Sequence, residues 1–117
     1  MVEFNKHYKL PVTYAHGYIF DKKAIVVMCV NSDIIGDSIV ELINTGKSAD
    51  IGSPLVKFPV KYTPTKIKDS DNHLLITIRG WGHFKYLPNG AEIQDAIGNE
   101  IAELINNNND TSQTLDK

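Results

Sequence analysis

The side chains of this 117-residue chain that are best suited to chemistry lie in one short stretch. Residues 79–86 read Arg-Gly-Trp-Gly-His-Phe-Lys-Tyr and combine a guanidinium, a lysine, a histidine and three aromatic rings. Aromatic faces stack on nucleobases, and cations neutralise phosphates. The two glycines permit a tight corner that would bring these side chains together. This composition favours the binding of a nucleotide or a similar small anion.

Strand alternation enlarges this candidate site, because residues two apart in a strand share a face. Lys57 and Lys61 would share one face of a strand, and Thr77 and Arg79 would share one face of another. The residues expected to bind the ligand are therefore Arg79, Trp81, His83, Lys85, Lys57 and Lys61. The alternative is structural: Trp81 fills the core, and the glycines beside it shape a bulge.

The charge of the chain is unevenly distributed. Its net charge of −2 argues against a general nucleic-acid binder. Residues 55–87, however, hold six basic and two acidic side chains, a balance of +4, so the remainder carries −6. Such asymmetry steers an anionic ligand towards one face. The alternative is that the lysines protect an edge strand from aggregation.

The other reactive side chains lack partners at useful spacings. The four histidines are His7, His16, His73 and His83. None is spaced from another histidine, a cysteine or a carboxylate as metal ligands are, so we expect no metal and no cofactor. Cys29 is the single cysteine, is expected in the core, and fits a reducing, cytoplasmic location. A small hydrolase or transferase with His83 or His16 as base is a third functional hypothesis.

Two expected amphipathic helices organise the chain. Residues 32–44 and 94–106 are identical at eight of thirteen positions, and both carry an apolar stripe at helical spacing. Each has a glycine at the same place, Gly36 in the first and Gly98 in the second. A glycine inside a helix costs about 1 kcal/mol relative to alanine. We therefore expect each helix to approach the other helix, or a sheet, closely at its glycine.

The remaining segments favour strands. Residues 12–20, 24–30, 55–62 and 74–79 are rich in β-branched and aromatic side chains. The segment 24–30 is apolar on both of its faces, including Val26 and Met28, so we expect it to be buried on both. The helices would cover one face and a second protomer the other. The sequence thus predicts a homodimer with Gly36, Gly98, Val26 and Met28 at packing positions.

These elements predict an α+β fold. We expect a mainly antiparallel sheet of about four strands with two helices on one face, in the order β-β-α-β-β-α, with an internal duplication. Residues 1–106 would form a single domain, and residues 107–117 a polar, flexible tail. No apolar run is long enough to cross a bilayer, so we expect no membrane association.

The leading functional hypothesis is a non-enzymatic binding protein that holds a small anionic, nucleotide-like ligand. The alternative is a protein-interaction module, such as a phage-type inhibitor of a host protein or a subunit of a complex, that uses the acidic helix faces or an apolar sheet face. The acidic faces comprise Asp33, Asp37 and Glu41 in one helix and Glu92, Asp95, Asn99 and Glu103 in the other. In size and manner the chain resembles small proteins of phages and other mobile elements. This resemblance implies binding to a host protein or a signalling molecule rather than catalysis.

Overall fold

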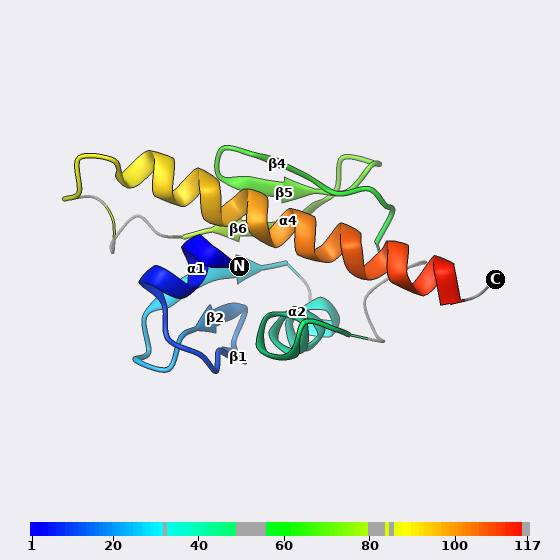
Figure 1. Cartoon of the computed structure of the whole chain (residues 1–117), viewed down its shortest axis with the longest axis horizontal. Helices are drawn as coiled ribbons and strands as arrows, with labels where there is room; N and C mark the ends of the chain where they lie inside the picture. The colour runs from blue at the N-terminus through cyan, green and yellow to red at the C-terminus, as the bar shows by residue number, and fades with distance from the viewer. Residues whose placement is uncertain (32, 49–55, 80–83, 85, 116–117) are drawn as a thin grey trace.

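The computed structural model describes residues 1–31, 33–48, 56–79, 84 and 86–115 (Figure 1). This part of the chain is α+β, which confirms the expected fold class. It forms one antiparallel sheet of six strands with three helices, which corrects the expected four strands and two helices. The strands are β1 (Thr13–Ala15), β2 (Tyr18–Phe20), β3 (Val26–Val30), β4 (Lys61–Thr63), β5 (Lys66–Lys68) and β6 (Leu74–Ile78). The helices are α1 (Val2–His7), α2 (Asp33–Thr45) and α4 (Gly90–Leu115).

The additional strands arise from short hairpins. The expected strand at residues 12–20 is a hairpin, because His16 and Gly17 have φ angles of 51° and 86°, as a tight hairpin turn requires. β4 and β5 form the matching hairpin, so the expected strand at residues 55–62 begins only at Lys61. Each of these strands has three residues, too few for an alternating pattern to be recognised. Helix α1 is likewise too short to be predicted from a helical pattern, since its six residues make fewer than two turns.

The two halves of the sheet are copies of each other, in the order β1-β2-β3-β6-β5-β4. Matching strand residues are 48 positions apart, as are Thr13 and Lys61 at the starts of β1 and β4. Matching helix residues, such as Gly36 and Gly98, are 62 positions apart. The second half therefore has 14 additional residues, the difference between the two separations. They lie between β6 and Asp95, which matches the start of α2 at Asp33, and the last of them form the first turn of α4. The duplication seen in the helix sequences thus extends to the strands.

One asparagine closes each half in the same way. The side-chain oxygen of Asn44 accepts a hydrogen bond from the Val12 N–H at 2.8 Å, and its amide donates to the Val12 carbonyl at 3.0 Å. Asn106 makes the same two bonds with Val60, at 2.8 and 2.9 Å. Each asparagine therefore links its helix to the residue that directly precedes the first strand of its half.

Helices α2 and α4 cover the same face of the sheet. Tyr14 of β1 pairs directly with Ile19 of β2, and direct cross-strand partners point to one side. The ring of Tyr14 lies against Gly36 of α2, where the Cβ of any other residue would overlap it. In the second half, the ring of Tyr62 lies against Gly98 of α4 in the same way. Figure 1 shows α4 running lengthwise over β4, β5 and β6, with α2 seen end-on near β1.

A hydrogen bond holds each tyrosine ring over its glycine. The Tyr62 hydroxyl donates to Asp95 Oδ1 at 2.7 Å, and the Tyr14 hydroxyl donates to Asp33 Oδ1. Burial, followed by the bond to Asp95, raises the pKa of Tyr62. The bond to Asp33 is the main cause of the raised pKa of Tyr14. These fixed rings give a physical reason for glycine at a helical position where it costs about 1 kcal/mol.

A change of register explains the apolar sequence of β3. The register against β2 shifts in this strand, and the consecutive residues Val27 and Met28 are both buried. Val26 and Cys29 are half-buried and lie on the face away from the helices. Such a bulge accounts for consecutive buried residues without a second covered face. A homodimer that covers β3 therefore stays a prediction.

Helix α4 continues past Asn106 to Leu115, whereas the sequence predicts a polar tail from residue 107. A contact remote in sequence anchors the first added turn. The Ser48 N–H donates to Asn108 Oδ1 at 3.2 Å, and the Asn108 amide donates to the Ser48 carbonyl at 2.9 Å. Even at this length, neither α4 nor another helix of the described chain combines the length and apolar character of a membrane span.

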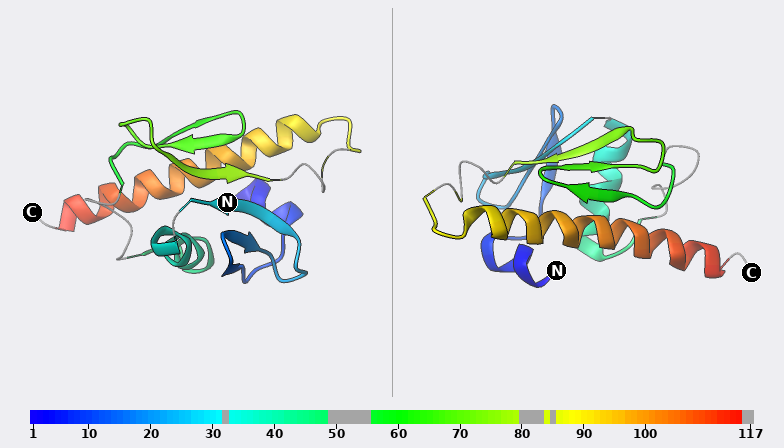
Figure 2. Two further views of the ribbon diagram at one scale, coloured as in Figure 1. Left: turned by 180° about the vertical axis from the view of Figure 1, so that it is seen from behind. Right: turned by 90° about the horizontal axis from the view of Figure 1, so that it is seen from above.

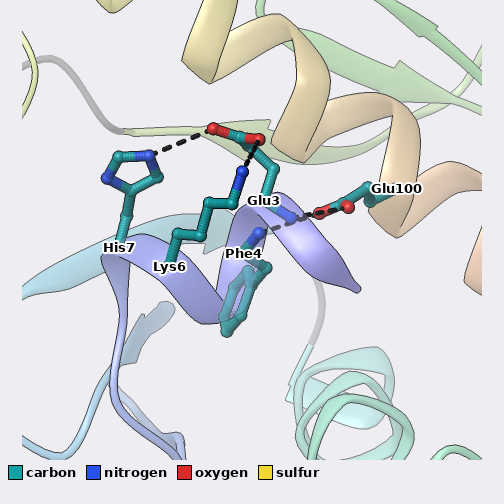
Figure 3. A network of polar contacts seen from close by, with 5 residues as sticks. All are labelled: Glu3, Phe4, Lys6, His7 and Glu100. Atoms are coloured by element: carbon teal, nitrogen blue, oxygen red, sulfur yellow. Dashed lines mark hydrogen bonds and ion pairs between the residues drawn. The ribbon is translucent and has the colours of Figure 1, made fainter.

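The N-terminal helix α1 is fixed to α4 by a single carboxylate. Glu100 accepts hydrogen bonds from the N–H groups of Glu3 and Phe4, both at 2.9 Å (Figure 3). Lys6 and His7 contact the Glu3 carboxylate at 3.7 and 3.2 Å, and the Phe4 side chain is fully buried. Figure 2 (right view) shows α4 between α1 and the strands β4, β5 and β6. The helices therefore form a layer on one side and leave the other sheet face to solvent.

Candidate ligand-binding face

The sheet face opposite α2 and α4 bears the side chains that alternate with the buried ones, and we name it the open face. Direct cross-strand pairs form one row over all six strands on this face. From β1 to β4 the row is Ala15, Tyr18, Cys29, Thr77, Lys66 and Thr63. Shorter rows flank it, with Thr13, Phe20 and Val26 in the first half and Lys61, Lys68 and Leu74 in the second. All twelve side chains are at least partly exposed, so a ligand can reach them.

The two halves of the open face differ in chemistry. Tyr18 and Phe20 project from β2, with ring centroids 6.3 Å apart. The matching positions on β5 hold Lys66 and Lys68, and Lys61 follows on β4. None of the three lysines forms an ion pair with a residue that the structure describes. We call the β1–β3 part of the open face the aromatic half and the β4–β6 part the lysine half.

Arg79 joins the two halves. Its N–H donates to the Val27 carbonyl at 2.9 Å, which continues the pairing of β6 with β3. Its guanidinium Nη1 donates to Cys29 Sγ at 3.6 Å, so it lies over the open face of β3. Cys29 is the direct partner of Tyr18. A guanidinium therefore lies one strand from the exposed tyrosine ring, at the border between the halves.

The fold separates the two signs of charge. The six strands contain three lysines and no acidic residue. Helices α2 and α4 contain three and five acidic residues and neither lysine nor arginine. Because the helices cover one face only, the open face is positive although the chain carries −2. Such a field attracts anions to the open face.

A pocket of about 460 Å³ lies at the edge of the aromatic half. It is lined by Pro11, Thr13, Phe20, Asp21, Lys22 and Ala24. The Asp21 carboxylate shapes its wall, because it accepts hydrogen bonds from the N–H groups of Lys9, Lys23 and Ile25 at 2.9–3.0 Å. The ring of Phe20 and the ammonium group of Lys22 remain available to a ligand. A volume of this order is typical of small-molecule sites.

The structure places the expected site residues in three different situations. Trp81, His83 and Lys85 lie outside the described residues. Lys61 and Arg79 are both on the open face but not side by side, because Lys61 is level with Leu74 at the start of β6 and Arg79 follows its end. Lys57 is exposed but precedes β4, where its carbonyl accepts a hydrogen bond from the Ser70 N–H at 2.8 Å. Of the expected packing residues, Gly36 and Gly98 lie under tyrosine rings, Met28 is buried and Val26 is on the open face.

Four residues of the open face are not among those predicted from the sequence: Tyr18, Phe20, Lys66 and Lys68. The signal that could have revealed them is the pair of three-residue patterns Tyr-Ile-Phe and Lys-Ile-Lys. In each pattern an isoleucine, fully buried in the structure, separates two outward side chains. The match between the two patterns becomes clear only when the strands are aligned 48 residues apart.

His7, His73 and Cys29 have structural contacts in the described chain. His73 lies 3.5 Å from the Asp69 carboxylate, and Cys29 accepts a hydrogen bond from Arg79. His16 is exposed in the turn between β1 and β2. Within the described ranges, no three His, Cys, Asp or Glu side chains are placed to hold a metal ion. A nucleophile paired with a base, as covalent catalysis requires, is not found among these contacts.

Comparisons of the chain with protein-family models, curated proteins and solved structures gave no significant match. No relative therefore assigns a role to any residue of this chain. We therefore infer the function from the chemistry of the open face and from the position of each side chain within it.

Proposed function

We propose that this chain is a non-enzymatic binding protein whose open face holds an anionic, nucleotide-like ligand. The observation that carries the proposal is the arrangement of three lysines, Arg79 and two aromatic rings on a sheet face without acidic residues. Lysine and arginine neutralise phosphate groups, and exposed aromatic rings stack on bases. A nucleotide carries both groups in one molecule.

The position of Arg79 favours a ligand that lies over the border between the halves. Its guanidinium, held at Cys29, can contact a phosphate while the base stacks on Tyr18 or enters the pocket beside Phe20. Lys66 then lies across β6 from this phosphate, because it is the direct partner of Thr77. A ligand in this position would meet cations on one side and an aromatic ring on the other.

A protein-interaction module that uses the acidic helices is a second candidate, favoured by the absence of lysine and arginine from α2 and α4. Three of the acidic groups already have structural partners. Asp33 and Asp95 bind tyrosine hydroxyls, and Glu100 binds the start of α1. This leaves fewer free acidic groups for a partner and favours the open face as the binding surface. A cytoplasmic location accompanies the proposal as a prediction from the sequence. The predicted homodimer would compete with the ligand, because its second protomer would cover β3 on the open face.

Calorimetric titration with ATP tests the proposal. The test variant combines Lys61→Gln, Lys66→Gln and Lys68→Gln, and the control combines Lys6→Gln, Lys9→Gln and Lys47→Gln, which are exposed lysines outside the strands. Both variants lose the same net charge. Three surface cation contacts at about 0.5–1 kcal/mol each predict an affinity at least about tenfold lower for the test variant alone.

An equal loss in both variants would show that only net charge matters, and would contradict the proposal. Unchanged ATP affinity in the test variant would also contradict it. Circular dichroism melts of both variants control for folding. Native mass spectrometry of the protein as purified adds a direct search, because a bound nucleotide would appear as additional mass.

A further inference from the structure

We infer that the ligand of the open face is single-stranded nucleic acid, which crosses the six strands along the central row. This inference rests on the proposed function and names the class of nucleotide ligand. Its basis is the length of the row, the separation of the aromatic and lysine halves, and the location of the acidic residues on the helices.

The row is longer than one nucleotide. Six strands separated by about 4.8 Å extend over roughly 24 Å, and Tyr18 and Lys66 are three strand spacings, roughly 14 Å, apart. A mononucleotide engages the border at Arg79 or one end of the row. A chain of up to about seven nucleotides engages both halves, at the roughly 3.4 Å rise per nucleotide of a stacked strand.

The side chains on and beside the central row match the bases and the phosphates of a single strand. Tyr18 and Phe20 offer ring faces to unpaired bases, and the pocket beside Phe20 can take a base that leaves the stack. Arg79, Lys66, Lys68 and Lys61 offer cations to successive phosphates. Duplex DNA keeps its bases paired inside the helix, so the aromatic half has nothing to stack on.

The net charge of −2 does not conflict with this inference, because it is not spread evenly. The acidic side chains of α2 and α4 project from the opposite side of the sheet. They repel nucleic acid from the helix layer and leave the open face as the surface for binding. The inference concerns single strands only. It agrees with the expectation that the chain is not a general nucleic-acid binder, since a duplex has no favourable site on the open face.

Fluorescence anisotropy with labelled dT12, at several salt concentrations, tests the inference on the full chain. We expect dT12 to bind at least tenfold more tightly than ATP, and a 12-base-pair duplex to bind at least tenfold more weakly than dT12. With four phosphate contacts, the slope of log K against log salt should be about −3. The triple variant at Lys61, Lys66 and Lys68 should lose about 2 units of this slope, and the control triple variant at Lys6, Lys9 and Lys47 should keep it.

Tyr18 supplies a matched pair of variants for the stacking contact. Tyr18→Leu should weaken dT12 binding at least about fivefold, whereas Tyr18→Phe, which keeps the ring, should bind as the wild type does. Tyr18 is 39% exposed, so neither change should unfold the chain, and a thermal melt checks this.

The outcomes separate the two proposals. Equal affinity for ATP and dT12, with both lost in the open-face triple variant, would overturn the polymer ligand and leave the proposed function standing. Unchanged dT12 and ATP binding in that variant would overturn both. Equal binding of duplex and single strand, or no difference between Tyr18→Leu and Tyr18→Phe, would overturn the single-strand inference alone.

Discussion

The two halves of this molecule share one scaffold and differ in what they present to solvent. Each half has a tyrosine over a helical glycine, an asparagine that binds the strand entry, and an aspartate that closes a turn. On the open face, by contrast, Tyr18 and Phe20 stand where the second half has Lys66 and Lys68. The contacts that hold each half together are therefore the same in both halves, whereas the residues exposed on the open face are aromatic in one half and basic in the other.

The halves also differ in their last connection. The second half has 14 additional residues between its third strand and the part of its helix that matches α2. Arg79 matches Asn31 at the 48-residue separation, since the N–H of each donates to the neighbouring central strand. Residues 80–86, most of the stretch that suggests ligand binding in the sequence, follow Arg79 and belong to the addition. The addition therefore directly follows a residue of the proposed binding face.

Disrupting the tyrosine–glycine contact should give the largest loss of stability. Gly98→Leu and Gly36→Leu should each destabilise the fold by about 3 kcal/mol, because the new side chain meets a tyrosine ring that is fixed by hydrogen bonding. Thermal melts should show a fall of roughly 10 °C or more. The control Asn99→Leu, at an exposed position beside Gly98, should change stability by less than about 0.5 kcal/mol. An unchanged melting temperature for Gly98→Leu would contradict the close contact.

The asparagine contacts should give the next largest effect. Asn106→Ala and Asn44→Ala each remove two hydrogen bonds to the backbone of Val60 or Val12. A loss of about 2 kcal/mol is expected for each, since a buried N–H and carbonyl lose their partners. Urea unfolding measures the loss, with Asn99→Ala as the control. A large effect in one half and none in the other would show that the duplicated contacts are not equivalent.

Exchanging the open-face residues sharpens the comparison without disturbing the fold. Tyr18→Lys with Phe20→Lys makes both halves basic, and Lys66→Tyr with Lys68→Phe makes both aromatic. Each double variant should bind ATP about tenfold more weakly, with a steeper salt dependence in the first and a shallower one in the second. Titrations at two salt concentrations distinguish the variants. The same salt dependence in both would contradict separate roles for the halves.

The smallest expected effect is a dependence of stability on acid. Burial alone would raise the pKa of Asp69, but hydrogen bonds from the N–H groups of His73, Lys57 and Asp71 outweigh it and lower the pKa below 3.8. The carboxylate therefore stabilises the fold fully above about pH 4, and this contribution is lost as pH falls through the lowered pKa. Urea unfolding between pH 2 and 6 should show the loss, and Asp69→Asn should reduce it. If Asp69→Asn lost stability with falling pH as the wild type does, Asp69 would not be the cause of the acid dependence.

The sequence reveals α2, α4 and the fold class because long periodic segments carry a strong signal. The near copies at residues 32–44 and 94–106 even indicate the duplication. The match between the strands is hard to detect from the sequence because few residues are shared, among them Tyr14 with Tyr62 and Asp21 with Asp69. In addition, the separation between matching residues is 48 in the strands and 62 in the helices, so one alignment does not cover both. These shared residues are the ones with structural partners, and such partners are invisible until the chain is folded.

Only part of the candidate site could be predicted from the sequence. Lys61 and Arg79 could be assigned to one face from strand alternation. Tyr18 and Phe20 could not, because they lie far from Arg79 in sequence and come near it only through the pairing of β2, β3 and β6. A binding face that crosses strands from both halves depends on the order of the strands, which residue spacing alone does not contain.

Chemical-shift mapping by NMR tests the central claim, that the open face is the binding face, most directly. A ¹⁵N-labelled sample titrated with ATP should show the largest amide shifts at Tyr18, Cys29, Thr77 and Lys66, with little change at Asp37 and Glu103 on the helices. Shifts confined to α2 and α4, or no shift along the central row at millimolar ATP, would contradict the account.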